Sequence, residues 1–273
     1  MLRPVLGGIA LPWAWIDRGP VVARIGDLAP VTAAITRAAL ARGILRLRVM
    51  PYWVDAEAPQ AEDQLRTIGF HEAHRPDGAH ACTLRIDLRG KTDSQLFLGK
   101  SKSQIRWRMK QAEREGASAR RGTTEDWERL RAMHRALMRA QGRGARPSTW
   151  WSAVERFVTE GDGGALFACD FNARVVSAGV VLRHGPRATY AWGASVEDKL
   201  PFSKAILPLV AGIRWARDVG CSCFDLGGVP LEGDRDPKRN AIAMFKFDFD
   251  KRRVLLVREH VAWCASVPGA ARK

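Results

Sequence analysis

The sequence predicts a layered fold of the α/β (α+β) class, and three observations support this prediction. Along the 273 residues, segments whose polarity alternates as in strands are followed by segments of helical periodicity, and the two kinds alternate. Hydrophobic residues make up 46% of the chain and charged residues 27%, the balance of a chain that buries a sizeable core. No apolar run reaches the ~18 residues of a membrane-spanning helix. The composition excludes a disordered chain, a collagen and a small disulfide-rich scaffold, and no secretory signal is expected.

The first part of the chain is expected to alternate strands with helices. Asp27 is placed to cap the first helix and Gly43 to end it. Between Ile44 and Val49 apolar residues alternate with arginines, which is typical of a strand. The expected elements are a strand over 20–24, a helix over 27–41, a strand over 44–49, a helix over 58–67 and a strand over 82–88.

A basic helix and a second series of strands and helices follow. Thr124 is the expected N-cap of one helix, and Ser148 or Thr149 that of the next. The expected elements are helices over 101–115, 125–141, 148–159 and 198–220, with strands over 117–121, 165–169, 175–183, 187–194, 223–226, 241–249 and 254–257.

The charge is strongly basic and unevenly distributed. Lys and Arg number 44 against 29 acidic residues, for a formal charge of +15. The stretch 100–146 holds 14 basic and 5 acidic residues. Such a field attracts polyanions, namely RNA, DNA or an anionic membrane face. The basic side of the helix over 101–115 is either a solvated face or, as the local charge favours, a track for phosphates.

Metal and disulfide chemistry are not expected. The five cysteines are an odd number, and Cys221 and Cys223 lack the two-residue spacing of zinc ligands, which suits free thiols in a reducing cytoplasm. The histidines at 71, 74 and 80 are expected to be solvated loop residues. The acidic residues at 232, 234 and 236 fit no complete metal motif.

Three motifs in order carry a resemblance to a known family. The segment 190–195 reads YAWGAS, the segment 225–228 reads DLGG, and Phe245-Lys246 follows. This series resembles the Fem family of non-ribosomal peptidyltransferases, whose pattern is YxYGxS, a helix, DxGG and FK. The segments Arg18-Gly19-Pro20, Gly69-Phe70 and Ile86-Asp87-Leu88 are also similar, so the match covers most of the chain.

The resemblance implies tandem acyltransferase domains of the GNAT type. A truncated GNAT-like domain over 1–99, a basic linking helix over 100–116 and a complete C-terminal GNAT domain over 117–273 are expected. The first domain is shorter than in the family, and the helical-hairpin arm of some Fem proteins is absent. Aminoacyl-tRNA is the implied co-substrate, with no other cofactor, and the implied tRNA-binding residues are Lys100, Lys102, Arg106, Arg108, Lys110 and Arg114.

The FK motif supplies the expected catalytic residues, Phe245 and Lys246. In a strand over 241–249, Lys246 would lie opposite the face of Phe245, Phe247 and Phe249, either in solvent or as a fixed cation beside the reacting ester. Further substrate-binding residues are implied with structural alternatives left open. Asp225, Gly227 and Gly228 line the substrate or form a tight turn; Tyr190 and Trp192 share a strand face; Arg146 and Trp150 line the acceptor site or lie in a solvated loop.

The leading functional hypothesis is transfer of an aminoacyl group from tRNA to an amine, either a peptidoglycan precursor or a natural-product amine. No Ser-His-Asp or Cys-His arrangement is evident, which suits direct attack by the amine, with Asp248 or the tRNA ribose as a base. The alternatives are an acyl-coenzyme A N-acyltransferase and a non-catalytic RNA-binding protein. The coenzyme A hypothesis is disfavoured because 199–205, where its glycine-rich pyrophosphate turn would lie, contains no glycine. A cytoplasmic monomer is expected.

Overall fold

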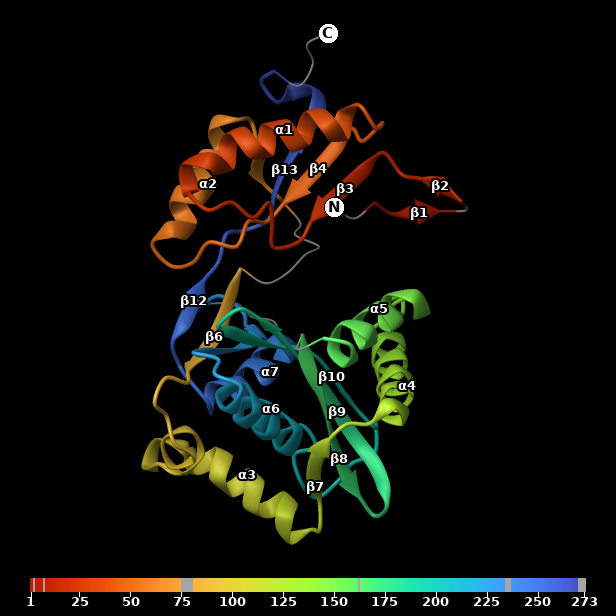
Figure 1. Ribbon diagram of the computed structural model, residues 1–273, viewed down its shortest axis with the longest axis vertical. Coiled ribbons are helices and arrows are strands. Elements are labelled where there is room, and N and C mark those ends of the chain that lie inside the picture. Colours follow the sequence, from red (N-terminus) through yellow and green to blue (C-terminus); the bar gives the residue numbers. More distant parts are fainter. Residues whose placement is uncertain (2, 7, 75–80, 162, 234–236, 270–273) are drawn as a thin grey trace. The chain divides into compact units, whose positions relative to one another are not determined.

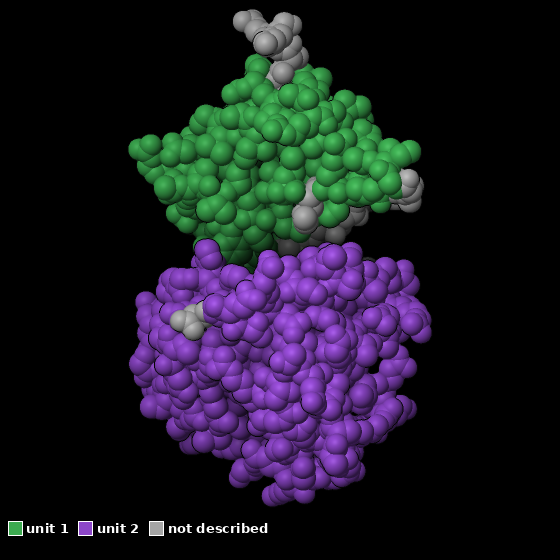
Figure 2. Space-filling model, turned by 45° about the vertical axis from the view of Figure 1, so that its right-hand side comes forward, with its two compact units in different colours: residues 1–83, 228–240, 253–273 green, residues 84–227, 241–252 purple. Residues whose placement is uncertain are grey.

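The computed structural model describes residues 1, 3–6, 8–74, 81–161, 163–233 and 237–269. They form two compact units, shown in different colours in Figure 2. Unit 1 comprises Met1–Thr83, Gly228–Asn240 and Arg253–Lys273, and unit 2 comprises Leu84–Gly227 and Ala241–Arg252. The units therefore interleave along the chain. This differs from the expected division at 99 and 116, because the C-terminal segment supplies a strand to unit 1 and the basic helix belongs to unit 2.

Unit 1 is a four-stranded sheet with two helices packed on one face (Figure 1). The strand order is β3-β4-β13-β5; β3 is parallel to β4, and β13 is antiparallel to both β4 and β5. Alternate strand residues such as Ala14, Leu47 and Ala262 join the helices in one buried cluster. The elements are β3 (Trp13–Ile16), α1 (Leu28–Leu40), β4 (Arg46–Val49), α2 (Glu57–Thr67), β5 (His71–Glu72), β12 (Arg253–Leu255), β13 (His260–Trp263), and the short helical turns η1 (Ile25–Asp27) and η4 (Cys264–Ser266).

The helices of unit 1 and the strand β4 were predicted from the sequence within a few residues, but other strands of this unit were not. The expected strand over 20–24 is wrong, because β3 takes the place beside β4. Asp27 does not cap α1 with its side chain and instead pairs with Arg24. Also missed were β13 and a separate two-stranded ribbon of β1 (Val5–Leu6) and β2 (Ile9–Ala10). Such short strands leave too few residues to show an alternation.

Unit 2 contains a mixed sheet through which the strands run in the order β6-β11-β10-β9-β8-β7. The strands β7 to β10 are antiparallel neighbours in chain order, whereas β11 is parallel to β10. Their bounds are β6 (Cys82–Asp87), β7 (Ser118–Arg121), β8 (Gly164–Phe171), β9 (Arg174–His184), β10 (Arg187–Ser195) and β11 (Cys223–Gly228).

Helices cover both faces of this sheet (Figure 1). On one face, α4 and α5 form an apolar cluster that includes Trp127, Trp151 and Val180. On the other face lies α6, where Gly212 is so close to Val181 that a Cβ would stand 2.7 Å from its methyl group. The helices are α3 (Ser103–Arg114), α4 (Thr124–Ala140), α5 (Ser148–Thr159), α6 (Ile206–Asp218) and α7 (Pro237–Phe247), with the turns η2 (Ser94–Leu98) and η3 (Lys100–Lys102) before α3.

The segment 241–249, expected as a strand, belongs largely to helix α7. The rings of Phe245 and Phe249, four residues apart, lie with centroids 5.8 Å apart, which is the neighbour spacing of a helix face. The alternation of Phe245, Phe247 and Phe249 indicated a strand, but the i, i+4 spacing of Phe245 and Phe249 also fits one face of a helix. Over so short a stretch the sequence pattern does not distinguish the two structures. Among the described residues, no helix is long and apolar enough to cross a membrane.

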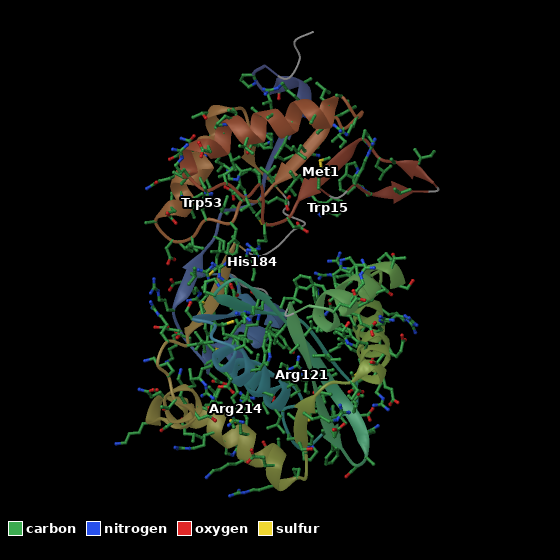
Figure 3. All side chains as sticks on the ribbon, in the orientation of Figure 1. Met1, Trp15, Trp53, Arg121, His184 and Arg214 are labelled. Carbon is green, nitrogen blue, oxygen red and sulfur yellow. The ribbon has the colours of Figure 1, made fainter. Side chains whose placement is uncertain are left out.

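An ion pair joins α6 to the segment that precedes α3. Arg214, labelled in Figure 3, donates from Nε to Asp93 at 2.7 Å, and Arg217 donates to the other carboxylate oxygen at 2.5 Å. The guanidinium of Arg214 also lies 5.4 Å from the ring centroid of Phe97. This contact holds the basic helix in unit 2.

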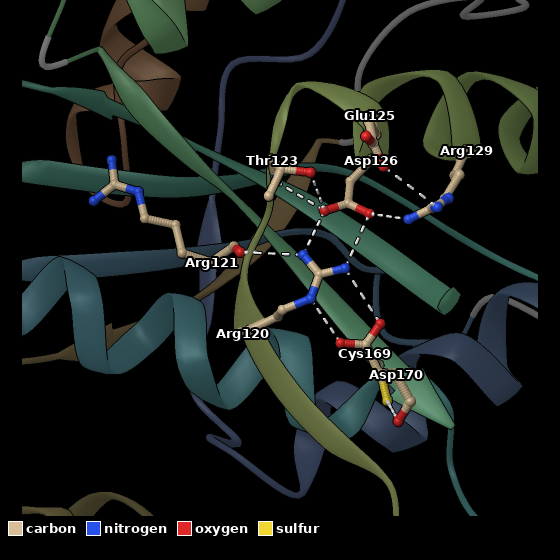
Figure 4. A network of polar contacts seen from close by, with 8 residues as sticks. All are labelled: Arg120, Arg121, Thr123, Glu125, Asp126, Arg129, Cys169 and Asp170. Carbon is tan, nitrogen blue, oxygen red and sulfur yellow. Dashed lines mark hydrogen bonds and ion pairs between the residues drawn. The ribbon is translucent and has the colours of Figure 1, made fainter. Parts of the chain in front are cut away.

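A network of ion pairs around the buried carboxylate of Asp126 connects β7, β8 and α4 (Figure 4). Asp126 is fully buried and forms a capping box with Thr123, which is the N-cap one residue before the expected Thr124. Arg120 pairs with Asp126 at 2.5 Å and with Asp170 at 2.7 Å, while Arg129 reaches Asp126 at 2.9 Å. Burial raises the pKa of Asp126, but hydrogen bonds from Arg120, Thr123 and Arg129 outweigh it and lower the pKa.

Asp126→Ala is expected to lower the free energy of unfolding by about 3 kcal/mol at pH 7, because it leaves buried cationic and amide groups without their acceptor. The folded-state pKa of Asp126 lies below its usual value, so this stabilisation is present above pH ~4 and is lost as the pH falls. Urea denaturation at pH 7 and pH 3.5 measures both effects. Glu128→Ala is the control on the same helix, because Glu128 is exposed and its pair with Arg131 contributes less than about 1 kcal/mol. Equal losses in the two variants would contradict this assignment.

Candidate active site in unit 2

The strands β10 and β11 part, and a cavity opens where they separate. They pair only from Arg187↔Cys223 to Thr189↔Asp225, after which β10 continues to Ser195 against β9. The cavity measures about 550 Å³. Its walls are mainly apolar and come from α3, α4, β9, β10, β11, α6 and α7, with Arg108 and Lys246 as charged groups. Its lining residues are Arg108, Leu137, Ser177, Ala178, Tyr190, Gly193, Ala194, Ser195, Ser203, Ala205, Pro208, Leu209, Leu226, Ala241, Ile242, Phe245 and Lys246.

A β-bulge places Tyr190 and Trp192 on opposite faces of the sheet, so the expectation that they share one is wrong. Tyr190 pairs with Val181, but Trp192 pairs with Val180, so one extra residue stands between them. Tyr190 therefore shares the α6 face with Val181, and Trp192 joins the cluster of α4 and α5. Burial raises the pKa of Tyr190 to about 12, which keeps its hydroxyl protonated at neutral pH.

The Tyr190 ring lies against two glycines, Gly179 on the neighbouring strand β9 and Gly193 on its own strand β10. A Cβ on Gly179 would stand 2.6 Å from the ring, and a Cβ on Gly193 would stand 2.0 Å from the hydroxyl oxygen. Gly193 is part of the YAWGAS segment, so that motif includes both the bulge and the space that the tyrosine occupies.

Lys246 is a largely buried cation at the cavity wall. Burial lowers its pKa to about 8, while the charge of Asp225 acts in the opposite direction. Asp225 is 4% exposed, accepts a 2.8 Å hydrogen bond from the Gly227 amide and lies 3.4 Å from Arg85. Gly227 has φ +77°, and a Cβ there would stand 3.6 Å from the Lys246 Nζ. Asp225, Gly227 and Lys246 thus lie together, and Lys246 is on a helix and turned inward instead of lying on the expected strand.

The cations of α3 do not form one continuous outer face. Arg108 lines the cavity, pairs with Asp248 at 3.1 Å and stacks 5.5 Å from the ring centroid of Phe245. Lys102 donates to the carbonyl of Phe249, and burial lowers its pKa. Arg106 is half-buried and donates to the Leu98 carbonyl at 2.9 Å. Three of the six expected tRNA-binding residues are exposed, namely Lys100, Lys110 and Arg114.

Arg146 and Trp150 contact each other, but they lie outside the cavity lining. The Arg146 guanidinium stacks 5.1 Å from the Trp150 ring centroid. Trp150 packs edge-on against Trp151 at 4.9 Å and Trp192 at 4.7 Å. This aromatic group lies on the α4 and α5 side of the sheet.

Reasoning from the sequence missed several cavity residues, among them Leu137, Ser177, Ser203 and Ile242. No motif marks them, because they come from α4, β9, the loop before α6 and α7, which are far apart in the sequence. Ser195 and Gly193 were within the quoted motif and were not singled out. Among the described residues that line the cavity there is no histidine, cysteine or carboxylate, whereas three serines, Tyr190, Arg108 and Lys246 are present. The two cations suit binding and charge stabilisation.

Within the described ranges no group of His, Cys, Asp and Glu is arranged to hold a metal ion. His80, Asp234 and Asp236 lie outside these ranges. All five cysteines are free thiols.

The mixed sheet with a cavity between its parting parallel strands defines an acyltransferase of the GNAT class. Residues 99–239, just over half of the chain, match the family model described as an acetyltransferase (GNAT) domain. The chain therefore belongs to this family and is an acyltransferase. No curated protein matches the sequence.

Three solved structures share the fold at low sequence identity. FemX is 15% identical with a TM-score of 0.71, covering 95% of this chain and 86% of FemX. The L-PGS of Bacillus licheniformis is 14% identical with a TM-score of 0.58, over 86% and 72% of the two chains. A tandem GNAT protein from the clavulanic acid biosynthesis pathway is 12% identical with a TM-score of 0.55, over 95% and 81%. These similarities confirm the expected GNAT-type fold.

Gly193→Ala is expected to lower the free energy of unfolding by about 2 kcal/mol, because its methyl group overlaps the Tyr190 hydroxyl in a packed sheet. Chemical denaturation measures the change. Gly144→Ala is the control, since a Cβ there meets nothing within 4 Å and Gly144 has no positive φ. An unchanged free energy of unfolding in the Gly193→Ala variant would contradict the position of the Tyr190 ring against Gly193.

Lys246→Met is expected to stabilise the protein at pH 7 by about 1–3 kcal/mol, because it removes a buried ammonium group. The folded-state pKa of Lys246 is about 8 and its ordinary value is 10.5, so the wild type gains stability as the pH rises between these values. The advantage of the variant should therefore shrink from pH 7 to pH 10 in urea denaturation. Lys251→Met, at an exposed lysine nearby, should show no such trend. A destabilised Lys246→Met variant would contradict the burial of this charge.

Proposed function

We propose that this acyltransferase moves an aminoacyl group from aminoacyl-tRNA to an amine acceptor and forms an amide bond. The observation that carries the proposal is the turn between β10 and α6. This turn contains no glycine, and Lys204 fills it: its ammonium donates to the carbonyls of Val196 and Asp198, the latter at 2.8 Å. Ser177 donates to the Lys204 carbonyl at 2.5 Å. A turn occupied in this way is a poor cradle for a pyrophosphate, which supports an RNA-borne donor over a coenzyme A thioester.

The described charges suit a reaction in which the donor is already activated. The acceptor amine attacks the ester carbonyl, the C–N bond forms, the bond to the ribose oxygen breaks, and that oxygen receives the proton from the amine. Negative charge develops on the carbonyl oxygen, and the Lys246 ammonium in the apolar cavity is placed to stabilise it. Asp248, one expected base, is already engaged in an ion pair with Arg108, which favours the ribose as the proton acceptor.

Each partner has a candidate surface. The exposed lysines 100 and 110 and Arg114 are proposed to contact phosphates of the tRNA. Arg146, stacked on Trp150, presents an exposed guanidinium that suits a carboxylate or phosphate of the acceptor. A peptidoglycan precursor and a natural-product amine both fit as acceptors, in keeping with the similarity to FemX and to the clavulanic acid pathway protein.

A second candidate function is transfer from an acyl-coenzyme A. The match to an acetyltransferase domain over 99–239 favours it. The two donors are distinguished directly by supplying each one alone.

The test is product formation from radiolabelled aminoacyl-tRNA and candidate amines, with RNase-treated tRNA and acetyl-coenzyme A in parallel. We expect transfer only with intact tRNA and binding that weakens steeply with salt. In single-turnover transfer at saturating tRNA, Lys246→Met should be slower by about a hundredfold or more, whereas Lys251→Met should match the wild type. Lys246→Arg should rescue poorly, because the planar guanidinium does not place its charge where the ammonium does.

Product formation from acetyl-coenzyme A without RNA would overturn the proposed donor. Normal transfer by a folded Lys246→Met variant would remove Lys246 from the reaction and leave it as a buried structural lysine.

A further inference from the structure

The β1–β2 ribbon exposes aliphatic side chains that nothing in unit 1 covers. The side chains of Val5 and Ile9 are 63% and 72% exposed. The ribbon leads directly into β3, at the edge of the four-stranded sheet (Figure 1). A lone two-stranded ribbon is marginally stable in water, so exposed aliphatics on it indicate a surface that meets another apolar phase.

Tryptophan and arginine side chains lie next to this ribbon, on the face of the sheet opposite α1 and α2. The register places Trp13 beside Arg46, and Arg46 beside Trp263. Their neighbours Ala14, Leu47 and Ala262 point into the core, so these three share the other face. Trp263 is 58% exposed, and the Arg46 guanidinium lies 5.9 Å from its ring centroid.

The segments that build this end of unit 1 contain no acidic residue. Residues 1–16, 37–47 and 260–269 hold no Asp or Glu, but include Arg3, Arg37, Arg42 and Arg46. Arg3 ties the ribbon to the rest of the unit, donating to the Leu11 carbonyl at 2.7 Å and to the Arg42 carbonyl at 3.1 Å. These bonds go to main-chain oxygens, so they leave the positive charge uncompensated.

Protruding aliphatics, tryptophans beside them and uncompensated arginines together match the chemistry of a lipid–water interface. Aliphatic groups enter the acyl region, tryptophan prefers the headgroup level, and arginine attracts anionic headgroups. A single-stranded nucleic acid would use the tryptophans and arginines but would gain nothing from Val5 and Ile9. We infer that the β1–β2 ribbon and the Trp13–Arg46–Trp263 row form a peripheral binding site for anionic phospholipid surfaces.

The test is sedimentation of the full chain with two kinds of vesicle. One kind contains phosphatidylcholine alone, and the other also contains about 30% phosphatidylglycerol, which supplies anionic headgroups. The wild type should bind the anionic vesicles and not the neutral ones. The double variant Val5→Asp, Ile9→Asp should bind at least tenfold more weakly. Val21→Asp is the matched control, because Val21 is 85% exposed in unit 1 beyond the other end of β3, and it should bind as the wild type does.

A second measurement does not depend on the folding of the ribbon variant. Brominated phosphatidylglycerol vesicles quench tryptophan fluorescence at the interface, and Trp263→Phe should remove part of that quenching. Trp107→Phe, at a tryptophan of matching exposure (57%) on α3, should remove none. Absence of binding to anionic vesicles, equal binding by the ribbon variant, or quenching that is insensitive to Trp263→Phe would overturn the proposal. Release of the vesicles by single-stranded RNA together with equal binding by the ribbon variant would assign the face to nucleic acid instead.

Discussion

The parting of β10 and β11 is the constraint on which the rest of unit 2 depends. Main-chain pairing between these parallel strands ends at Thr189 and Asp225, so further backbone groups of β10 face a cavity instead of a neighbouring strand. The β-bulge begins at the next residue and turns Tyr190 into that space. Helix α7 adds Phe245 and Lys246 to the wall. A gap at this point leaves room for an acyl group and for the acceptor that attacks its carbonyl carbon.

Burial, more than the number of charges, assigns roles to the cations of this basic chain. Lys246 and Arg108 are drawn into an apolar wall, where the low dielectric constant strengthens their interaction with a developing negative charge. Arg120 and Arg214 neutralise carboxylates and hold elements together. The remaining exposed cations are screened by solvent and suit long-range attraction of a polyanion. The same residue types thus hold elements together and supply the cations on which the proposed chemistry and the proposed binding depend.

Part of the site was predictable because the sequence motifs are local. The motifs named Asp225, Gly227 and Lys246, and the structure brings them together: the Gly227 amide donates to Asp225, and a Cβ on Gly227 would lie 3.6 Å from the lysine Nζ. Arg146 and Trp150 were both named for the acceptor site, and the Arg146 guanidinium lies over the Trp150 ring where the loop enters α5. Ser177, Leu137 and Ile242 carried no signal, because residues distant in sequence become cavity walls only when the sheet and helices assemble.

The sequence by itself determined the alternation of strands and helices, the positions of α1, α2, α4 and α5 to within a few residues, and the motif order that indicates a GNAT-type acyltransferase. These features follow from local periodicity, caps and spacing. Only the tertiary structure decided that 241–249 is largely helical, that Tyr190 and Trp192 face opposite ways, and that the C-terminal strand β13 completes the sheet of unit 1. Each of these features depends on a partner far along the chain. Burial and strand pairing stabilise a segment through contacts with distant residues, so the local sequence pattern cannot reveal them.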